Sequence, residues 1–217
     1  MKPAPRHPGS GKSSPDHANT AMAKISRDSL LKPATYAAQR AEWRERVIPF
    51  KKLRTVHIGK QATVLFENEF TVRYQLQEMI RVDKSMETDD LAHELAVYNA
   101  LIPTNQALKA TLMLEFVDAD IRDAKLAQLQ GIEQAVWLKV DGHPPVHGRP
   151  IPGLDERNTD RASSVYFLSF QLSPEAARDF ICGEAVAMGI DHPAYRHSVD
   201  EISPETQSVL MEDLKLN

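Results

Sequence analysis

Short segments in which hydrophobic and polar residues alternate recur along the chain and predict β-strands. The most regular alternation runs through residues 164–172, where Tyr166, Leu168 and Phe170 would share one face of a sheet. Gly59 and Lys60 stand between two further segments of this kind and suit a tight turn. The pattern predicts strands over residues 53–58, 62–66, 110–116, 135–140 and 164–172, and a shorter strand over residues 185–190.

Other segments carry apolar residues at helical spacing or a helix start signal. Pro33 suits the first turn of a helix, and Pro49 is expected to end that helix. Residues 70–82 begin with β-branched residues, but their later part favours a helix. Ser173 and Ser203 are each followed by proline and glutamate, a capping pattern that should open a helix. Helices are therefore predicted over residues 33–47, 70–82, 89–101 and 118–130 and after each of these serines, with a long loop over residues 141–161.

This order of elements indicates the fold class. Strands come in pairs and helices are interposed irregularly, which favours an α+β fold with a largely antiparallel sheet and helices packed mainly on one face. No glycine-rich turn joins a predicted strand to a predicted helix, so a dinucleotide-binding fold has no support. We expect a single α+β domain over residues 22–217.

The first 21 residues differ from the rest. They contain four prolines and no leucine, isoleucine, valine or aromatic residue, so they have no apolar surface to bury. We expect residues 1–21 to form a disordered N-terminal tail. Gly11-Lys12-Ser13 matches the end of a phosphate-binding loop, but Arg6 stands where that motif needs glycine.

Composition narrows the class of protein. The chain has 217 residues, with 26 Lys and Arg against 30 Asp and Glu, and a formal charge of −4. This mild negative charge argues against bulk nucleic-acid binding. No apolar run reaches the roughly 18–20 residues that a membrane-spanning helix needs. The single Cys182 excludes an internal disulfide and a four-cysteine zinc site. We expect a soluble, cytoplasmic protein.

Several segments, in this order, resemble a known bacterial family. They are Phe66-Glu67-Asn68, residues 71–81, Glu94, Tyr98-Asn99, Leu101-Ile102-Pro103, Lys109-Ala110-Thr111, residues 131–137 and residues 189–195. The family is catalogued as domain of unknown function 3501, and the resemblance runs from about residue 25 to the C-terminus. Genes of this family often lie beside genes for rubrerythrin-like proteins and iron–sulfur oxidoreductases. The resemblance therefore implies a redox setting and a possible redox partner protein, but no activity and no cofactor.

The first candidate site is the segment from Gly189 to Tyr195. Asp191, His192 and Tyr195 supply a carboxylate, an imidazole and a phenol close to the end of a predicted strand. Imidazole changes charge near neutral pH, and a carboxylate can fix its tautomer. The alternative is a structural turn in which these side chains bond to the backbone.

The second candidate lies on the helix predicted over residues 70–82. Glu78 and Arg81 share a face of this helix with Tyr74. Asp90 and His93 of the next helix match half of a di-iron site, but the chain has no second half. The alternative is a solvated, charged helix face.

The third candidate is a pair of loop histidines, His143 and His147. In an extended loop they could close on a divalent metal ion together with Asp191 or His192. The alternative is a surface loop without a ligand.

Two functions remain open. The first is a non-enzymatic accessory or binding protein that works with rubrerythrin-like or iron–sulfur redox partners. The second is a small metal-dependent or general acid–base enzyme. It would use His192 with Asp191 and Tyr195, and Glu78, Arg81 or His143 could join them. Asp191 would orient His192, and Arg81 would hold an anionic substrate group.

Overall fold

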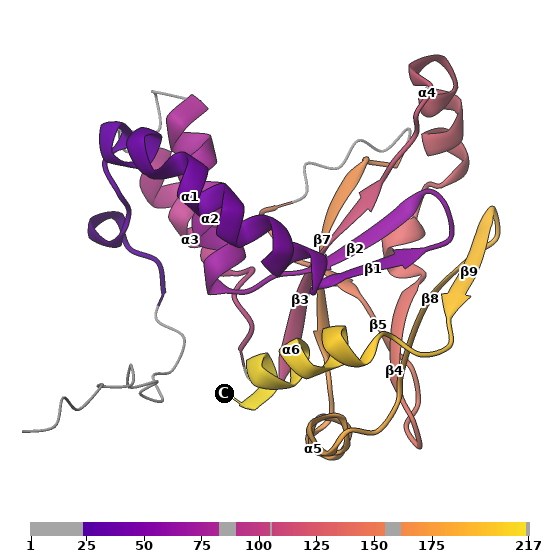
Figure 1. Ribbon diagram of the computed structural model, residues 1–217. Helices are drawn as coiled ribbons and strands as arrows, with labels where there is room; N and C mark the ends of the chain where they lie inside the picture. The colour runs from indigo at the N-terminus through magenta and orange to yellow at the C-terminus, as the bar shows by residue number, and fades with distance from the viewer. Residues whose placement is uncertain (1–23, 83–89, 105, 155–161, 216–217) are drawn as a thin grey trace, which may run out of the picture.

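The structure is a computed structural model that describes residues 24–82, 90–104, 106–154 and 162–215 (Figure 1). These residues form six α-helices and two β-sheets. The helices are α1 (Pro33–Lys52), α2 (Glu69–Val82), α3 (Asp90–Asn99), α4 (Ala119–Gln128), α5 (Pro174–Cys182) and α6 (Pro204–Lys215). The strands are β1 (Thr55–Ile58), β2 (Ala62–Phe66), β3 (Ala107–Leu114), β4 (Val136–Val140), β5 (Val146–His147), β6 (Arg149–Pro150), β7 (Val165–Gln171), β8 (Val186–His192) and β9 (Tyr195–Val199).

Every strand pairing in both sheets is antiparallel. One sheet has five strands in the order β1-β2-β3-β7-β6, and the other has four in the order β5-β4-β8-β9. The chain crosses between the sheets at Gly148, whose N–H donates to the Val136 carbonyl. A Cβ at this position would stand 3.1 Å from the Phe170 ring, so glycine permits the close approach. The predicted antiparallel α+β class is confirmed, with the strands divided between two sheets.

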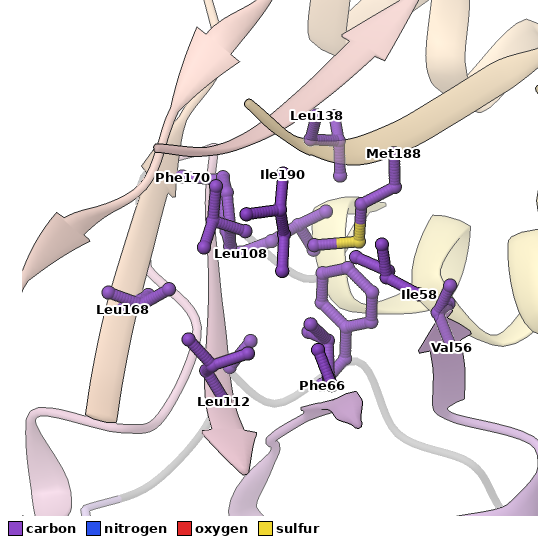
Figure 2. Packing of buried hydrophobic residues seen from close by; sticks show 14 of the residues in the cluster. Val56, Ile58, Phe66, Leu108, Leu112, Leu138, Leu168, Phe170, Met188 and Ile190 are labelled. Carbon is purple, nitrogen blue, oxygen red and sulfur yellow. The ribbon is translucent and has the colours of Figure 1, made fainter. Parts of the chain in front are cut away.

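The main core lies between the two sheets. In Figure 2, Phe66 and Leu112 of the five-stranded sheet point toward Met188 and Ile190 of the four-stranded sheet. These side chains come from alternate positions, as expected where each strand buries one face. Phe180 of α5 joins the same cluster.

A second cluster covers the opposite face of the five-stranded sheet. Val72 and Leu76 of α2 pack there with Leu101 and Ile151, and Phe167 of β7 packs against them from the sheet. Helices α1, α2 and α3 lie together on this side of the molecule, away from the four-stranded sheet (Figure 1). The five-stranded sheet is therefore covered by helices on one face and by a sheet on the other.

Most predicted elements are confirmed, including the helix over residues 70–82 and the two helices that begin after serine. Ser173 accepts a hydrogen bond from the Ala176 N–H, as a capping serine should. Gly59 takes a φ of +69° in the predicted turn between β1 and β2.

The predicted end of the first helix at Pro49 is wrong. The helix continues to Lys52, and the Leu53 N–H donates to the Pro49 carbonyl at 3.2 Å. A proline so near the end of a helix removes one bond but leaves the remaining turn intact.

Two predictions near the candidate sites need correction. The strand expected over residues 185–190 runs on to His192 and continues through a two-residue turn into β9, a strand that was not predicted. The loop expected over residues 141–161 contains the short strands β5 and β6. The tail expected over residues 1–21 lies outside the described residues, and the single domain over residues 22–217 stays a prediction.

Across the part of the chain that the structure describes, no helix combines the length and the apolar character needed to cross a membrane.

Candidate functional site

A cavity of about 240 Å³ lies between α2, α3 and the helix-covered face of the five-stranded sheet. Its walls are mostly apolar, and a few polar groups converge on it. Val165 is 38% exposed and Gln75 is also exposed, so the cavity opens to solvent beside these two residues. The lining residues are Lys51, Leu65, Glu67, Val72, Gln75, Tyr98, Leu101, Thr111, Met113, Val165 and Phe167.

Glu67 is the buried acidic group of this cavity, with only 8% of its surface exposed. The Thr111 hydroxyl donates to one carboxylate oxygen, Oε1, at 2.6 Å, and the Thr71 hydroxyl donates to the other, Oε2, at 2.5 Å. A buried carboxylate needs such donors to replace the water that it has lost. Within the described residues, no Lys, Arg or His side chain reaches ion-pair distance of this carboxylate.

Local structure explains why Glu67 lies here. Its N–H donates to the Lys109 carbonyl and extends the pairing of β2 with β3 by one residue. Asn68 then caps α2, because its side-chain oxygen accepts from the Thr71 N–H and its own N–H donates to the Thr71 hydroxyl. The carboxylate of Glu67 therefore lies at the positive N-terminal end of α2, which favours negative charge.

Arg54 fixes the backbone beneath this carboxylate. Its side chain is 2% exposed and donates to the carbonyls of Phe66 and Glu67, at 3.0 and 3.4 Å. It also forms a buried ion pair with Asp213 of α6. Burial raises the pKa of Asp213 to about 6, although the charge of Arg54 and its hydrogen bond act in the opposite direction. The Arg54–Asp213 ion pair thus links α6 to the backbone of Glu67, a residue of the cavity wall.

Two further polar side chains complete the wall. Burial raises the pKa of the Tyr98 phenol, and the negative charges of Glu94 and Glu67 raise it further, so this hydroxyl stays neutral at physiological pH. The Lys51 ammonium lies 5.4 Å from the centre of the Tyr74 ring, in a cation–π contact. The cavity can therefore hold an apolar body and offers a hydrogen-bond acceptor with negative charge at one end.

The predicted corner at residues 189–195 forms the β8–β9 hairpin. The Nε2–H of His192 donates to the Gln130 carbonyl at 3.1 Å, and its Nδ1 accepts from the Ala194 N–H at 3.2 Å. The Tyr195 hydroxyl is buried, donates to the Ile58 carbonyl at 2.6 Å and accepts from two N–H groups of the β1–β2 turn. Asp191 is exposed and lies 4.0 Å from the Arg196 side chain. These bonds hold the hairpin in place, and a catalytic role for the corner stays a prediction.

Glu78 and Arg81 lie where α1 meets α2 rather than beside that hairpin. The Glu78 carboxylate accepts from the Tyr36 hydroxyl and from Arg40, both at 2.7 Å, and from Arg81 at 3.2 Å. The hydrogen bond from Arg40, together with those from Tyr36 and Arg81, lowers the pKa of Glu78 to about 2 despite partial burial. The structure brings the predicted pair together, but as a link between two helices.

The structure does not bring the three predicted histidines together. His143 lies 2.7 Å from a carboxylate oxygen of Asp179 in α5, His147 is exposed on β5, and His192 bonds to the Gln130 carbonyl. Over the described ranges, no group of three His, Cys, Asp or Glu side chains is arranged to hold a metal ion. A metal-binding role for these histidines stays a prediction.

Sequence reasoning missed the cavity, although a signal for it was present. Glu67, Tyr98, Leu101 and Thr111 come from four separate segments among those that carry the family resemblance. Glu67 belongs to this resemblance but is not among the predicted site residues. The shared resemblance gives a reason to expect these segments close together in the fold, but their spacing in the sequence does not predict a cavity.

Comparison with known proteins gives a family and no activity. No curated protein matches the chain. A crystal structure of a novel protein of unknown function from Burkholderia pseudomallei K96243 is 37% identical and superimposes with a TM-score of 0.82. The match covers 88% of this chain and 99% of that one. The model of the family described as protein of unknown function DUF3501 matches residues 24–214. The chain therefore belongs to the DUF3501 family.

Proposed function

We propose that this protein is a non-enzymatic binding protein and that its ligand is a small molecule held in the cavity between α2, α3 and the five-stranded sheet. The observation that carries the proposal is an apolar cavity with one buried carboxylate, that of Glu67, in its wall. Ligand pockets in proteins typically combine apolar walls with a few placed polar groups.

The size of the cavity limits the ligand. A water molecule occupies about 30 Å³ in the liquid, so 240 Å³ corresponds to about eight water molecules. This room suits a molecule with a single ring or a short chain. Leu101, Met113 and Phe167 would cover its apolar part, and burial of that part supplies most of the affinity.

The neighbours of Glu67 favour binding over catalysis. The two hydroxyl groups that donate to it, those of Thr71 and Thr111, belong to a capping motif and a strand. The Tyr98 phenol is neutral at physiological pH, and burial raises its pKa further. Nucleophilic catalysis needs a nucleophile that an adjacent base activates. The described hydrogen bonds of Glu67 offer the hydroxyls of Thr71 and Thr111 for that part, but the Thr71 hydroxyl is already held in the helix cap by the Asn68 N–H.

The proposal is tested at the mouth of the cavity with benzyl alcohol, a neutral molecule of suitable size. Val165→Trp should fill the opening, because Val165 lines the cavity and is partly exposed. Val117→Trp is the matched control, since Val117 is fully exposed and does not line the cavity. We expect benzyl alcohol to shift methyl signals of Leu101 and Met113 in NMR spectra of the wild type and the control, but not of Val165→Trp. The same shifts in all three proteins would place the ligand elsewhere.

A role beside redox partners forms a further part of the proposal. It rests on the family resemblance, which implies rubrerythrin-like or iron–sulfur oxidoreductase partners, and a cytoplasmic location belongs with it. Affinity purification of the tagged protein from its native cells, under anaerobic and aerobic conditions, should recover such a partner. Recovery of the protein alone under both conditions would contradict this part without affecting the cavity.

The alternative, an acid–base enzyme at Asp191, His192 and Tyr195, has less support. Both ring nitrogens of His192 already bond to the backbone, and the Tyr195 hydroxyl has three backbone partners. A general base needs a free acceptor within reach of its substrate, so this role would require the hairpin to open first.

A further inference from the structure

The groups that line the cavity point to a chemical class of ligand. Resting on the proposed function, we propose that the ligand is a small organic cation, with one ammonium group on an apolar body, and that the ammonium binds the Glu67 carboxylate.

Both carboxylate oxygens of Glu67 keep a position that can accept a further hydrogen bond. Each carboxylate oxygen can accept about two hydrogen bonds. Oε1 receives one from Thr111 and Oε2 receives one from Thr71, so each oxygen keeps one position. An ammonium group carries N–H donors and positive charge together, so it can use both positions. A hydroxyl ligand could use only one of them.

The negative charge of Glu67 also favours a cationic ligand. Charged side chains that are buried are normally paired, because an isolated charge is costly away from water. Glu67 is 8% exposed, and among the described residues no cation lies at ion-pair distance of its carboxylate. Arg54 lies near the backbone of Glu67, but its side chain binds Asp213 and the carbonyls of Phe66 and Glu67 instead of the Glu67 carboxylate. A bound ammonium would supply the missing positive charge.

The other residues of the cavity wall also suit an organic cation. Tyr98 and Phe167 offer aromatic rings, and a cation interacts favourably with such rings. Lys51 also lines the cavity and repels positive charge placed near it, so a cationic group can lie at Glu67 but not beside Lys51. The lining therefore favours a ligand with one positive charge at one end and an apolar ring or chain at the other.

Three probes with the same body test this inference: benzylamine, benzyl alcohol and benzoate. Calorimetry at pH 7 should give the tightest binding for benzylamine, about 10-fold or more above benzyl alcohol, because hydrogen bonds between charged groups are the stronger ones. Benzoate should bind weakest, since its charge repels Glu67. Glu67→Gln should remove the advantage of benzylamine while it keeps the size of the side chain.

Glu115→Gln is the matched control. Glu115 also accepts a threonine hydroxyl bond, from Thr63 at 2.9 Å, but it is exposed and does not line the cavity. This variant should keep the full preference for benzylamine. If Glu67→Gln fails to fold, NMR of the wild type provides the same test. The benzylamine CH₂ group, which is next to the nitrogen, should then contact the methyl group of Thr111, because Thr111 bonds to Glu67.

The outcomes separate this inference from the proposed function. Equal affinity for benzylamine and benzyl alcohol, with both lost in Val165→Trp, would overturn the cationic ligand and leave the cavity as a binding site. An unchanged preference for benzylamine in Glu67→Gln would also overturn it. Failure of all three probes to bind the wild type would overturn the proposed function itself.

Discussion

Replacing Arg54 by methionine should destabilise the protein strongly. Arg54 and Asp213 are 2% and 4% exposed at their side chains, so neither charge is screened by water. Removing one partner of a buried ion pair typically costs about 3–5 kcal/mol, because the other group is left buried without its partner. Arg54→Met also removes the donor to the carbonyls of Phe66 and Glu67. Since domains of this kind are stable by about 5–15 kcal/mol, the loss is a large part of the total.

The measurement is urea unfolding at pH 7, followed by circular dichroism. The double variant Arg54→Met/Asp213→Leu should recover about 2 kcal/mol or more, because an apolar pair can replace a buried ion pair at little cost. Arg73→Met serves as the control, since the Arg73–Glu69 pair is partly exposed and should contribute only about 0.2–1 kcal/mol. A loss below about 1 kcal/mol for Arg54→Met, or a double variant less stable than the single one, would refute the reasoning.

Three further predictions concern stability and use the same assay. Burial raises the pKa of Asp213 to about 6, so the protonated group stabilises the folded state below about pH 4, and this contribution is lost as the pH rises through 6. The free energy of unfolding of the wild type, relative to that of Asp213→Asn, should therefore fall by up to about 3 kcal/mol between pH 4 and pH 7. A rise over this range would contradict the assignment. The pH dependence expected for Glu78 has the opposite direction, because Arg40 lowers the pKa of this group to about 2. Glu78→Gln should lower the free energy of unfolding by about 1–2 kcal/mol at pH 7, allowing for solvent screening, and the difference from the wild type should vanish as the pH falls through 2. Gly189→Ala should cost about 1–3 kcal/mol, because its Cβ would overlap the Trp137 indole, and an unchanged unfolding midpoint would contradict this expectation.

Local chemistry made much of the fold predictable. Period-two alternation identified β7, and the capping serines at 173 and 203 identified α5 and α6. The division into two sheets was not predictable, because the crossover at Gly148 depends on packing against Phe170, far along the chain. Pro49 misled the prediction because propensity rules describe the interior of a helix better than its last turn.

The candidate site was harder to predict than the fold. The segment around His192 looked reactive because it gathers an acid, an imidazole and a phenol, but hairpin pairing turns these groups toward backbone partners. The sequence does not mark Glu67 as a site residue, because its role depends on burial and on hydroxyl donors 4 and 44 residues away. A sequence pattern shows which chemical groups are present, whereas tertiary contacts decide which of them face a cavity.

The most direct test of the central claim is a crystal structure of the wild-type protein with benzylamine at saturating concentration. Our account predicts the ring between Leu101, Met113 and Phe167, with the nitrogen at hydrogen-bond distance from the Glu67 carboxylate. A cavity filled by protein side chains, or benzylamine bound only at another surface, would contradict it.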